Sequence, residues 1–329
     1  MDLTTQAYST LFISNLLLKT SYTKEKVSFS RWTTTVSNTF YIVDVFAERK
    51  YSGNQLAVVT KASEITDLEM QKIANEMHFS ETAFIKSNKK TNNGYDIRIF
   101  TPSIEVPFAG HPTLGSAFIV KHFLAKSPSQ TIILNLELGK IEVTFQQTLQ
   151  ENEEICWMKQ IPPIFGQTFP RELFQNLLGL SASEFEPNLP IQVVSTGLPF
   201  VIVPLRTLDA VKKAMVNQTL LPTLTRQVQA GILVFCPQTY RKQNNLNVRV
   251  FVDAFDIPED PATGSGNGCL AAYVSYYQYF GSPKVDIRVE QGFEISRPSI
   301  LYLKADKFEE KIIVQVGGKV QLIAKGKLL

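Results

Sequence analysis

Cysteine is scarce in this sequence of 329 residues, with three residues, Cys156, Cys236 and Cys269, at wide spacing. An odd and scattered set argues against a disulfide framework and against zinc sites, and it fits a reducing compartment, so we expect a cytoplasmic protein. Long apolar runs are lacking too, since nothing approaches the roughly 18 consecutive apolar residues of a membrane span. The early apolar patch at residues 11–18 has no basic residue before it, which argues against a secretory signal.

A strong excess of charge of one sign is also missing. Lys and Arg number 33 against 30 for Asp and Glu, a net charge of +3. This surplus is too small to mark a nucleic-acid binder, so we expect neither nucleic acid nor a membrane as a partner. Hydrophobic residues make up 44% of the chain and charged residues 19%, which is enough apolar material to build cores. The length suggests two domains of about 150 residues each.

The first 39 residues differ from the rest of the chain. Residues 1–39 are rich in Ser and Thr and contain only Asp2 and Glu25 as acids. We interpret this segment as an N-terminal extension, either a poorly ordered tail or a weak targeting segment. Its single arginine, Arg31, disfavours a transit peptide, because such peptides usually carry several.

An internal duplication is visible in the remaining sequence. Three segments recur in the same order at offsets of 151 to 154 residues: 97–100 with 248–251, 108–111 with 262–265, and 131–145 with 285–299. Repeats of this kind indicate two similar structural units. We therefore predict a first half at residues 40–165 and a second half at residues 166–329. The last strands, within residues 311–325, could pair with either half.

Each half has the pattern of strands around one apolar helix. In the first half, alternating and β-branched residues predict strands at 40–46, 56–60, 82–85, 95–100, 132–136 and 140–145. A capping box at Thr66 and Glu69 opens an amphipathic helix that should lie outside the sheet. Residues 114–124 and 270–280 are apolar on nearly every side, which is typical of helices buried all round. The predicted fold is α+β, with two pseudo-symmetric halves that each wrap β-strands around a central apolar helix.

A glycine turn precedes each apolar helix, at Gly110 and at Gly264. The free N–H groups and the positive dipole end of a helix N-terminus bind carboxylates and phosphates. If a pseudo-two-fold axis relates the halves, both helix starts face one cleft and can hold one anion together. Glycines before helices are also ordinary chain punctuation, so either turn alone would carry no function.

The candidate proton-transfer groups lie around these turns. His111 starts the first apolar helix, where the dipole favours a neutral imidazole, whereas His78 and His122 have the pattern of structural residues. Asp260 and Ser265 flank the second turn and could equally form an Asx turn or a helix cap. Glu81 follows the amphipathic helix beside apolar residues. The local pattern alone favours a surface glutamate, whereas burial there would raise its pKa.

Six segments together resemble a known family: residues 43–46, 53–59, 80–84, 98–102, 105–113 and 260–265. Their sequences include Ser-Glu-Thr-Ala-Phe, Phe-Ala-Gly-His-Pro-Thr and Asp-Pro-Ala-Thr-Gly-Ser. In this order and spacing they resemble the phenazine biosynthesis PhzF-like isomerases, over about residues 40–329. The resemblance implies a diaminopimelate epimerase-like fold, an active site in the cleft between the halves, and a homodimer.

The resemblance also implies roles for individual residues. Glu81 would be the general acid/base, with His111, Asp260 and Ser265 as the other catalytic residues. The residues assigned to substrate binding are Ser80, Gly110, Gly264 and Asn54. The implied reaction moves a proton between carbons of a small cyclic carboxylate, without metal or cofactor.

Two alternatives stay open. Racemases of this fold use two opposed cysteines, but the corresponding positions here are Ala109 and Thr263, and Cys269 is better explained as a small buried hydrophobe. A non-catalytic or regulatory homodimer could also retain the cleft. The motifs belong to the shared machinery, so they do not identify the physiological substrate.

Overall fold

The computed structural model describes residues 37–127, 129–148, 153–252 and 258–329. Residues 38–328 form one compact unit. The predicted N-terminal extension lies outside the described residues, except for its last three positions. None of the helices in the described ranges is long and apolar enough to cross a membrane.

The first half is built from eight paired strands and one short addition. In pairing order they are β17 (Val320–Lys327), β1 (Thr39–Val45), β2 (Asn54–Thr60), β3 (Glu81–Ile85), β4 (Tyr95–Phe100), β6 (Thr131–Leu136), β7 (Gly139–Gln147) and β8 (Glu154–Lys159), with β5 (Glu105–Val106) beside β4. The pairs β2–β3 and β4–β6 are parallel and the others antiparallel. The six strands predicted from the sequence are all present.

The second half repeats this pattern strand by strand. Its order is β9 (Ile164–Phe169), β10 (Ile191–Ser195), β11 (Pro199–Pro204), β12 (Gly231–Cys236), β13 (Leu246–Phe251), β14 (Val285–Gln291), β15 (Ser299–Phe308) and β16 (Lys311–Gly318). The parallel pairs, β11–β12 and β13–β14, occupy the same places in the order as in the first half. The duplication inferred from the sequence is therefore a duplication of structure.

The last strands divide between the halves. Strand β16 pairs with β15 of the second half and with β8 of the first, whereas β17 returns to pair with β1. Strand β9 follows β8 directly and pairs with β10. The chain thus crosses between the halves once after β8 and once after β16.

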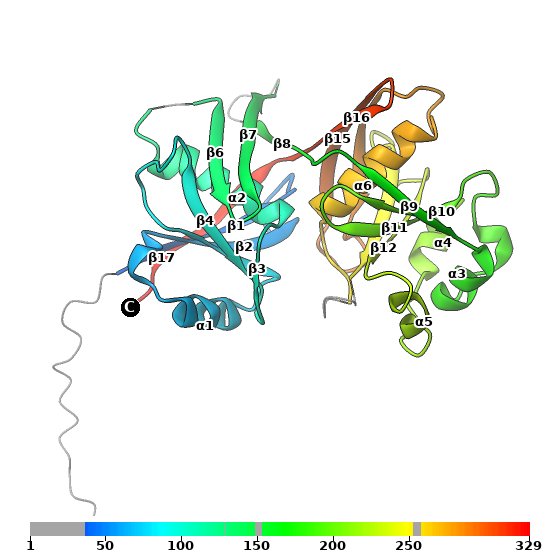
Figure 1. Ribbon diagram of the computed structural model, residues 1–329, viewed down its shortest axis with the longest axis horizontal. Coiled ribbons are helices and arrows are strands. Elements are labelled where there is room, and N and C mark those ends of the chain that lie inside the picture. The colour runs from blue at the N-terminus through cyan, green and yellow to red at the C-terminus, as the bar shows by residue number, and fades with distance from the viewer. Residues whose placement is uncertain (1–36, 128, 149–152, 253–257) are drawn as a thin grey trace, which may run out of the picture. The chain divides into compact units, whose positions relative to one another are not determined.

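Each half encloses one helix, α2 (Gly110–Ile119) or α6 (Gly264–Tyr276), and α2 continues as a π-helical turn at Val120–Leu124. Nine of the ten residues of α2 and the first twelve of α6 are buried, which agrees with the predicted all-round burial. The predicted bounds were wrong in one respect. Both helices begin at the glycine that the sequence places before them, but α6 ends at Tyr276, before residue 280. Figure 1 shows α2 among the strands of the first half and α6 among those of the second.

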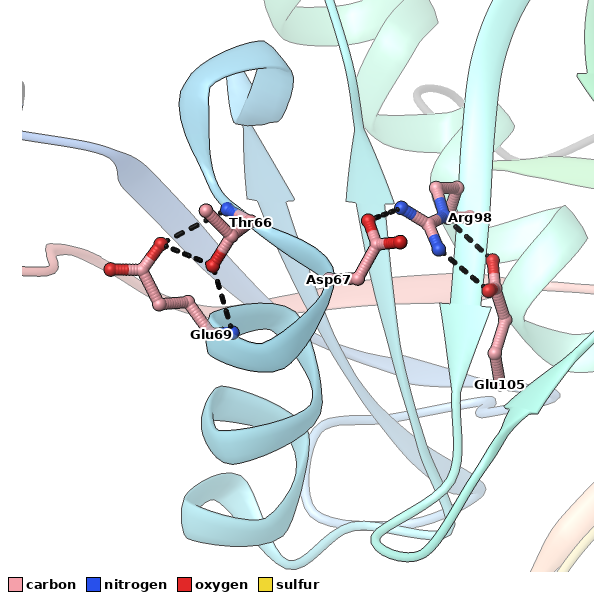
Figure 2. A network of polar contacts seen from close by, with 5 residues as sticks. All are labelled: Thr66, Asp67, Glu69, Arg98 and Glu105. Atoms are coloured by element: carbon pink, nitrogen blue, oxygen red, sulfur yellow. Dashed lines mark hydrogen bonds and ion pairs between the residues drawn. The ribbon is translucent and has the colours of Figure 1, made fainter.

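Helix α1 (Asp67–Met77) opens with the predicted capping box. The Thr66 hydroxyl accepts from Glu69 N, and the Glu69 carboxylate accepts from Thr66 N (Figure 2). The buried side of α1, at Met70 and Ala74, packs on side chains of β2, β3 and β4. At His78 the chain turns into a left-handed conformation and enters β3, so α1 fixes the approach to Glu81.

Short helices cover a face of the second half. They are α3 (Arg171–Leu178), α4 (Leu208–Lys213) and α5 (Leu221–Thr225), whose apolar residues form a second hydrophobic cluster with β10, β11 and β12. The 3-10 turns Ala62–Glu64 and Ala182–Glu184 connect neighbouring elements. The main core, by contrast, includes residues of both halves around α2 and α6.

Candidate active site

The N-termini of α2 and α6 lie directly against each other. A Cβ atom added to Gly110 would lie 3.3 Å from Gly264 Cα, and one added to Gly264 would lie 3.6 Å from Gly110 Cα. Glycine at both positions permits this approach of the two backbones. The first-turn N–H groups have no partner within their own helix, and the two positive dipole ends meet here. The arrangement is suited to binding one carboxylate from both halves.

The two helix starts use matching hydrogen bonds. The Ala109 carbonyl accepts from the backbone N–H and, at 2.7 Å, from the hydroxyl of Thr113. The Thr263 carbonyl accepts from the backbone N–H and, at 3.0 Å, from the side-chain amide of Asn267. The fourth residue of each helix therefore holds the N-cap carbonyl.

Glu81 and His111 meet beside this helix contact. Glu81 is the first residue of β3 and His111 the second of α2, and Glu81 Oε2 lies 3.4 Å from His111 Nε2. Their side chains are 15% and 6% exposed. Both atoms are buried without a hydrogen-bond partner in the part of the chain that the structure describes. Glu81 is thus not a surface glutamate, and its carboxyl group is available to a bound molecule.

His111 is held in its neutral form. Burial lowers its pKa to about 3, although a hydrogen bond to the backbone of Gln55 opposes this effect. Because one ring nitrogen donates to Gln55, the other, Nε2, presents a lone pair toward Glu81. The imidazole can therefore accept a hydrogen bond from a protonated Glu81 or from a ligand.

Asp260 is fixed by groups from both halves. Its Oδ1 accepts from Asn54 Nδ2 at 2.9 Å, and its Oδ2 accepts from the Thr263 hydroxyl at 2.6 Å. Asn54 also donates to the Ala262 carbonyl at 3.1 Å. Burial raises the pKa of Asp260 to about 6, the negative charge of Glu259 adds to the rise, and the two hydrogen bonds oppose it. Asp260 is therefore mainly a carboxylate at neutral pH.

Glu81 is able to hold or release a proton near neutrality. Burial is the main cause that raises its pKa to about 8, and the negative charge of Asp260 is the second. A general acid/base works best when its pKa lies close to the working pH, because both protonation states are then populated. Burial and a nearby like charge are the usual means of reaching this condition.

Gln291, which the sequence did not single out, organises the second turn. At the end of β14, its amide nitrogen donates to the Asp260 carbonyl at 2.8 Å and to the Thr263 hydroxyl at 2.9 Å. Its amide oxygen accepts from Thr263 N at 3.1 Å and from Asn267 at 2.8 Å. A single buried side chain thus fixes the position of Asp260 relative to the start of α6.

Two matching Arg–Glu pairs hold the segments that lead into the glycine turns. Arg98 Nε and Nη2 donate to the two oxygens of Glu105, both at 2.6 Å, and Arg249 donates in the same way to Glu259 at 2.9 and 2.8 Å. Each glutamate stands five residues before its glycine, Gly110 or Gly264. The arginines belong to the repeat seen in the sequence, but their partners were not predicted.

The remaining guanidinium nitrogen of each arginine binds a helix end. Arg98 Nη1 donates to Asp67 in the first turn of α1 (Figure 2). Arg249 Nη1 donates to the carbonyls of Val211, Lys212 and Ala214 at the end of α4, the shortest bond being 2.7 Å. Each arginine therefore ties a helix end to the segment that carries a glycine turn.

The two predicted serines adjoin residues of the site. Ser265 is the second residue of α6 and is buried, and Ser80 is half-buried just before Glu81.

Cys269 is fully buried, its Sγ lies 3.5 Å from the Leu198 carbonyl, and burial raises its pKa to about 12. Of the two other histidines, His78 is the C-cap of α1 and His122 lies 2.6 Å from Glu154. Across the described residues, no three His, Cys, Asp or Glu side chains gather in a possible metal site.

The raised pKa values predict that the folded state loses stability as the pH rises. Glu81 and Asp260 bind protons more tightly when folded than when unfolded. Their contribution is complete below about pH 4 and disappears as the pH rises through about 6 for Asp260 and about 8 for Glu81. We therefore expect the free energy of unfolding, measured by urea denaturation, to fall less between pH 5 and pH 8.5 in Glu81→Gln than in the wild type. The control variant Glu184→Gln, at a solvent-facing capping box, should show the same fall in the free energy of unfolding as the wild type. If Glu81→Gln also shows the full wild-type fall, the burial of the Glu81 carboxyl group is contradicted.

Comparisons with known proteins place the chain in one family. The profile of the family described as "Phenazine biosynthesis-like protein" matches residues 43–326. An uncharacterized isomerase of Pasteurella multocida is 33% identical over 293 residues, 88% of this chain and 93% of that protein. The trans-2,3-dihydro-3-hydroxyanthranilate isomerase of Pseudomonas fluorescens is 31% identical over 295 residues, 88% and 99% of the two chains. The crystal structure of the Bacillus anthracis phenazine biosynthesis protein of the PhzF family superposes with a TM-score of 0.80 at 26% identity and covers 90% of this chain and 100% of that one. The chain belongs to the PhzF-like family of phenazine biosynthesis-like proteins, has the diaminopimelate epimerase-like fold, and is an isomerase.

Proposed function

We propose that this isomerase moves a proton between two carbons of a small cyclic carboxylate, with Glu81 as the general acid/base. One observation carries the proposal: a buried carboxyl group, with a pKa of about 8, stands unpaired beside neutral His111. The meeting of two helix N-termini next to it supplies a site for the substrate carboxylate.

In the proposed reaction, the Glu81 carboxylate removes a proton from one ring carbon. The C–H bond breaks, and its electron pair spreads through the conjugated double bonds toward the substrate carboxylate. The same Glu81 O–H then gives the proton to another carbon, so a new C–H bond forms without net oxidation or reduction. The N–H groups of the first turns of α2 and α6 would stabilise the negative charge that develops on the carboxylate.

The other site residues would orient the substrate. Asp260 is an anionic acceptor with lone pairs beyond those used by Asn54 and Thr263, so it is suited to a hydroxyl or amino group. Neutral His111 would accept a hydrogen bond from protonated Glu81 and so hold the carboxyl group between the two proton transfers. Backbone N–H groups of Gly110, Gly264 and Ser265 would bind the carboxylate.

A single base fits proton migration better than racemization. Inversion at a carbon needs one acid/base group on each face, and the N-cap residues Ala109 and Thr263 have no group that ionises near neutrality. The Cys269 thiol is buried and hydrogen-bonded to the backbone, with a pKa raised to about 12. A two-thiol racemase is therefore disfavoured.

The direct test is solvent exchange by the wild-type protein. The first compound to assay is trans-2,3-dihydro-3-hydroxyanthranilate, the compound named for the relative from Pseudomonas fluorescens, followed by other cyclic dienyl carboxylates. In deuterated buffer, mass spectrometry should detect the isomerised product, with deuterium at carbon wherever the Glu81 proton exchanges with solvent between the two transfers. If no cyclic dienyl carboxylate is isomerised or exchanges, the proposed reaction is wrong.

A further inference from the structure

Gln160 has a buried amide that no described residue satisfies. It follows β8, at the first crossing between the halves, and is only 6% exposed. Both Oε1 and Nε2 are buried without a hydrogen-bond partner in the described ranges. Leaving a donor and an acceptor of one side chain unpaired costs folding free energy, so the amide calls for a partner from outside the chain.

The amide lies against α6 at Gly268. A Cβ atom on Gly268 would lie 3.0 Å from Gln160 Oε1, so the glutamine rests against the bare helix backbone. Gly268 follows Gly264 by four residues, which puts both on one helix face, about 6 Å apart along the axis. Gly264 contacts Gly110 at the proposed carboxylate site. The distance between the Gln160 amide and that site is therefore about the width of one small ring.

Thr196 adds a second polar group at the same place. Its Oγ1 would lie 3.0 Å from a Cβ on Gly268, the same distance as the Gln160 oxygen. The hydroxyl also lies 3.4 Å from the Ser265 carbonyl and 3.6 Å from Cys269 Sγ. The Gln160 amide and the Thr196 hydroxyl therefore both lie against one side of the first two turns of α6, at Gly268.

We propose that the Gln160 amide, with Thr196 beside it, binds a second hydrogen-bonding group of the substrate and so determines specificity. This inference rests on the proposed function for the position of the substrate carboxylate. A primary amide both donates and accepts, which matches a neutral hydroxyl or amino group better than a second anion. The substrate class is therefore a ring-sized carboxylate with a hydroxyl or amino substituent that lies beside Gln160 and Thr196.

The test compares ligands that differ by one hydroxyl group. Calorimetry should show that the wild type binds at least one of the three hydroxybenzoates more tightly than benzoate. Gln160→Met keeps the approximate size of the side chain and removes the amide, so it should abolish this preference, a loss of roughly threefold to tenfold in affinity. Benzoate itself should bind the variant and the wild type equally well.

A stability measurement distinguishes binding from support of the fold. Removing an unpaired buried amide should raise the melting temperature of unliganded Gln160→Met, by about 2–4 °C. The matched control is Gln192→Met: Gln192 is 9% exposed, donates to the Gly166 carbonyl at 3.0 Å and accepts from the Tyr277 hydroxyl at 2.6 Å. This control should melt at a lower temperature and keep the hydroxyl preference.

Two outcomes would overturn the inference: no hydroxyl preference in the wild type, or the same preference in Gln160→Met. A lower melting temperature of Gln160→Met with unchanged binding would show that the amide only supports the fold. These measurements use no turnover. Absence of both isomerisation and deuterium exchange in the wild type would therefore refute the proposed reaction without affecting the interpretation of the Gln160 result.

Discussion

Replacing Glu81 by glutamine will abolish the incorporation of solvent deuterium into the substrate while the protein stays folded. The amide has nearly the shape of the carboxyl group but cannot take up and release the proton. A single positioned acid/base commonly contributes about 10² to 10⁴ in rate, so a loss of at least this size is expected. The fold tolerates the change because burial already disfavours the charged form of this side chain and raises its pKa to about 8.

Two variants serve as controls for this experiment. Glu81→Asp keeps the carboxyl group but withdraws it by about one carbon–carbon bond, and a displacement of about 1 Å can cost 10²-fold in rate, so measurable exchange should remain. Glu184→Gln, at an exposed capping box of the second half, should exchange at the wild-type rate. Exchange by Glu81→Gln at the wild-type rate would exclude Glu81 from the proton transfer.

The strands and the buried helices could be predicted because their signals are local. Tyr95–Phe100 alternates buried and half-buried residues along most of its length, and its predicted bounds match the structure. The repeated Arg-x-Phe segment, at Arg98 and Arg249, revealed the duplication because both copies are the same strand in matching halves. Periodicity and repetition therefore suffice for the architecture.

The helical conformation of the first turns of α6 runs against local propensity. The first five residues of the helix, Gly264 to Gly268, contain three glycines and have low helix propensity, so the sequence resembles a turn. The structure makes this segment helical because Gly264 packs on Gly110, and Gly268 lies against Gln160. Contacts between residues more than a hundred positions apart thus override local propensity.

The candidate site could be predicted only in part, because some of its supporting contacts join residues that are far apart in the sequence. Resemblance supplied Glu81, His111 and Asp260, and the structure brings Glu81 within 3.4 Å of His111. The supporting residue Gln291 was missed because a glutamine at a strand end carries no signal of its own. Its importance comes from four hydrogen bonds to a segment about thirty residues away.

Removing Arg249 will destabilise the protein more than removing Arg98, although the two ion pairs have the same geometry. Arg249 and Glu259 are 12% and 11% exposed, whereas Arg98 and Glu105 are 25% and 32% exposed. Breaking a buried pair from one side leaves an uncompensated charge and typically costs about 3–5 kcal/mol, so Arg249→Met should lose an amount of this order. Urea denaturation at pH 7 measures both losses, and equal losses would contradict the role assigned to burial.

The double variant Arg249→Met/Glu259→Gln will recover part of that stability. It no longer buries an unpaired carboxylate, although the carbonyls at the end of α4 still lose their donor. The double-mutant cycle should therefore show strong coupling between Arg249 and Glu259; additive losses would show that the pair does not act as a unit.

The same variants connect this ion pair to the active site. The charge of Glu259 raises the pKa of Asp260. Arg249, which donates to Glu259 at 2.8 Å, places the opposite charge beside it, and removing a cation there favours the neutral form of a nearby carboxyl group. Arg249→Met should therefore raise the pKa of Asp260 further, and Glu259→Gln should lower it. The acidic limb of the pH dependence of exchange should move in opposite directions in the two variants. A purely structural pair would lower the rate in both without moving the limb, so the direction of the shift tells positioning of Asp260 from support of the fold.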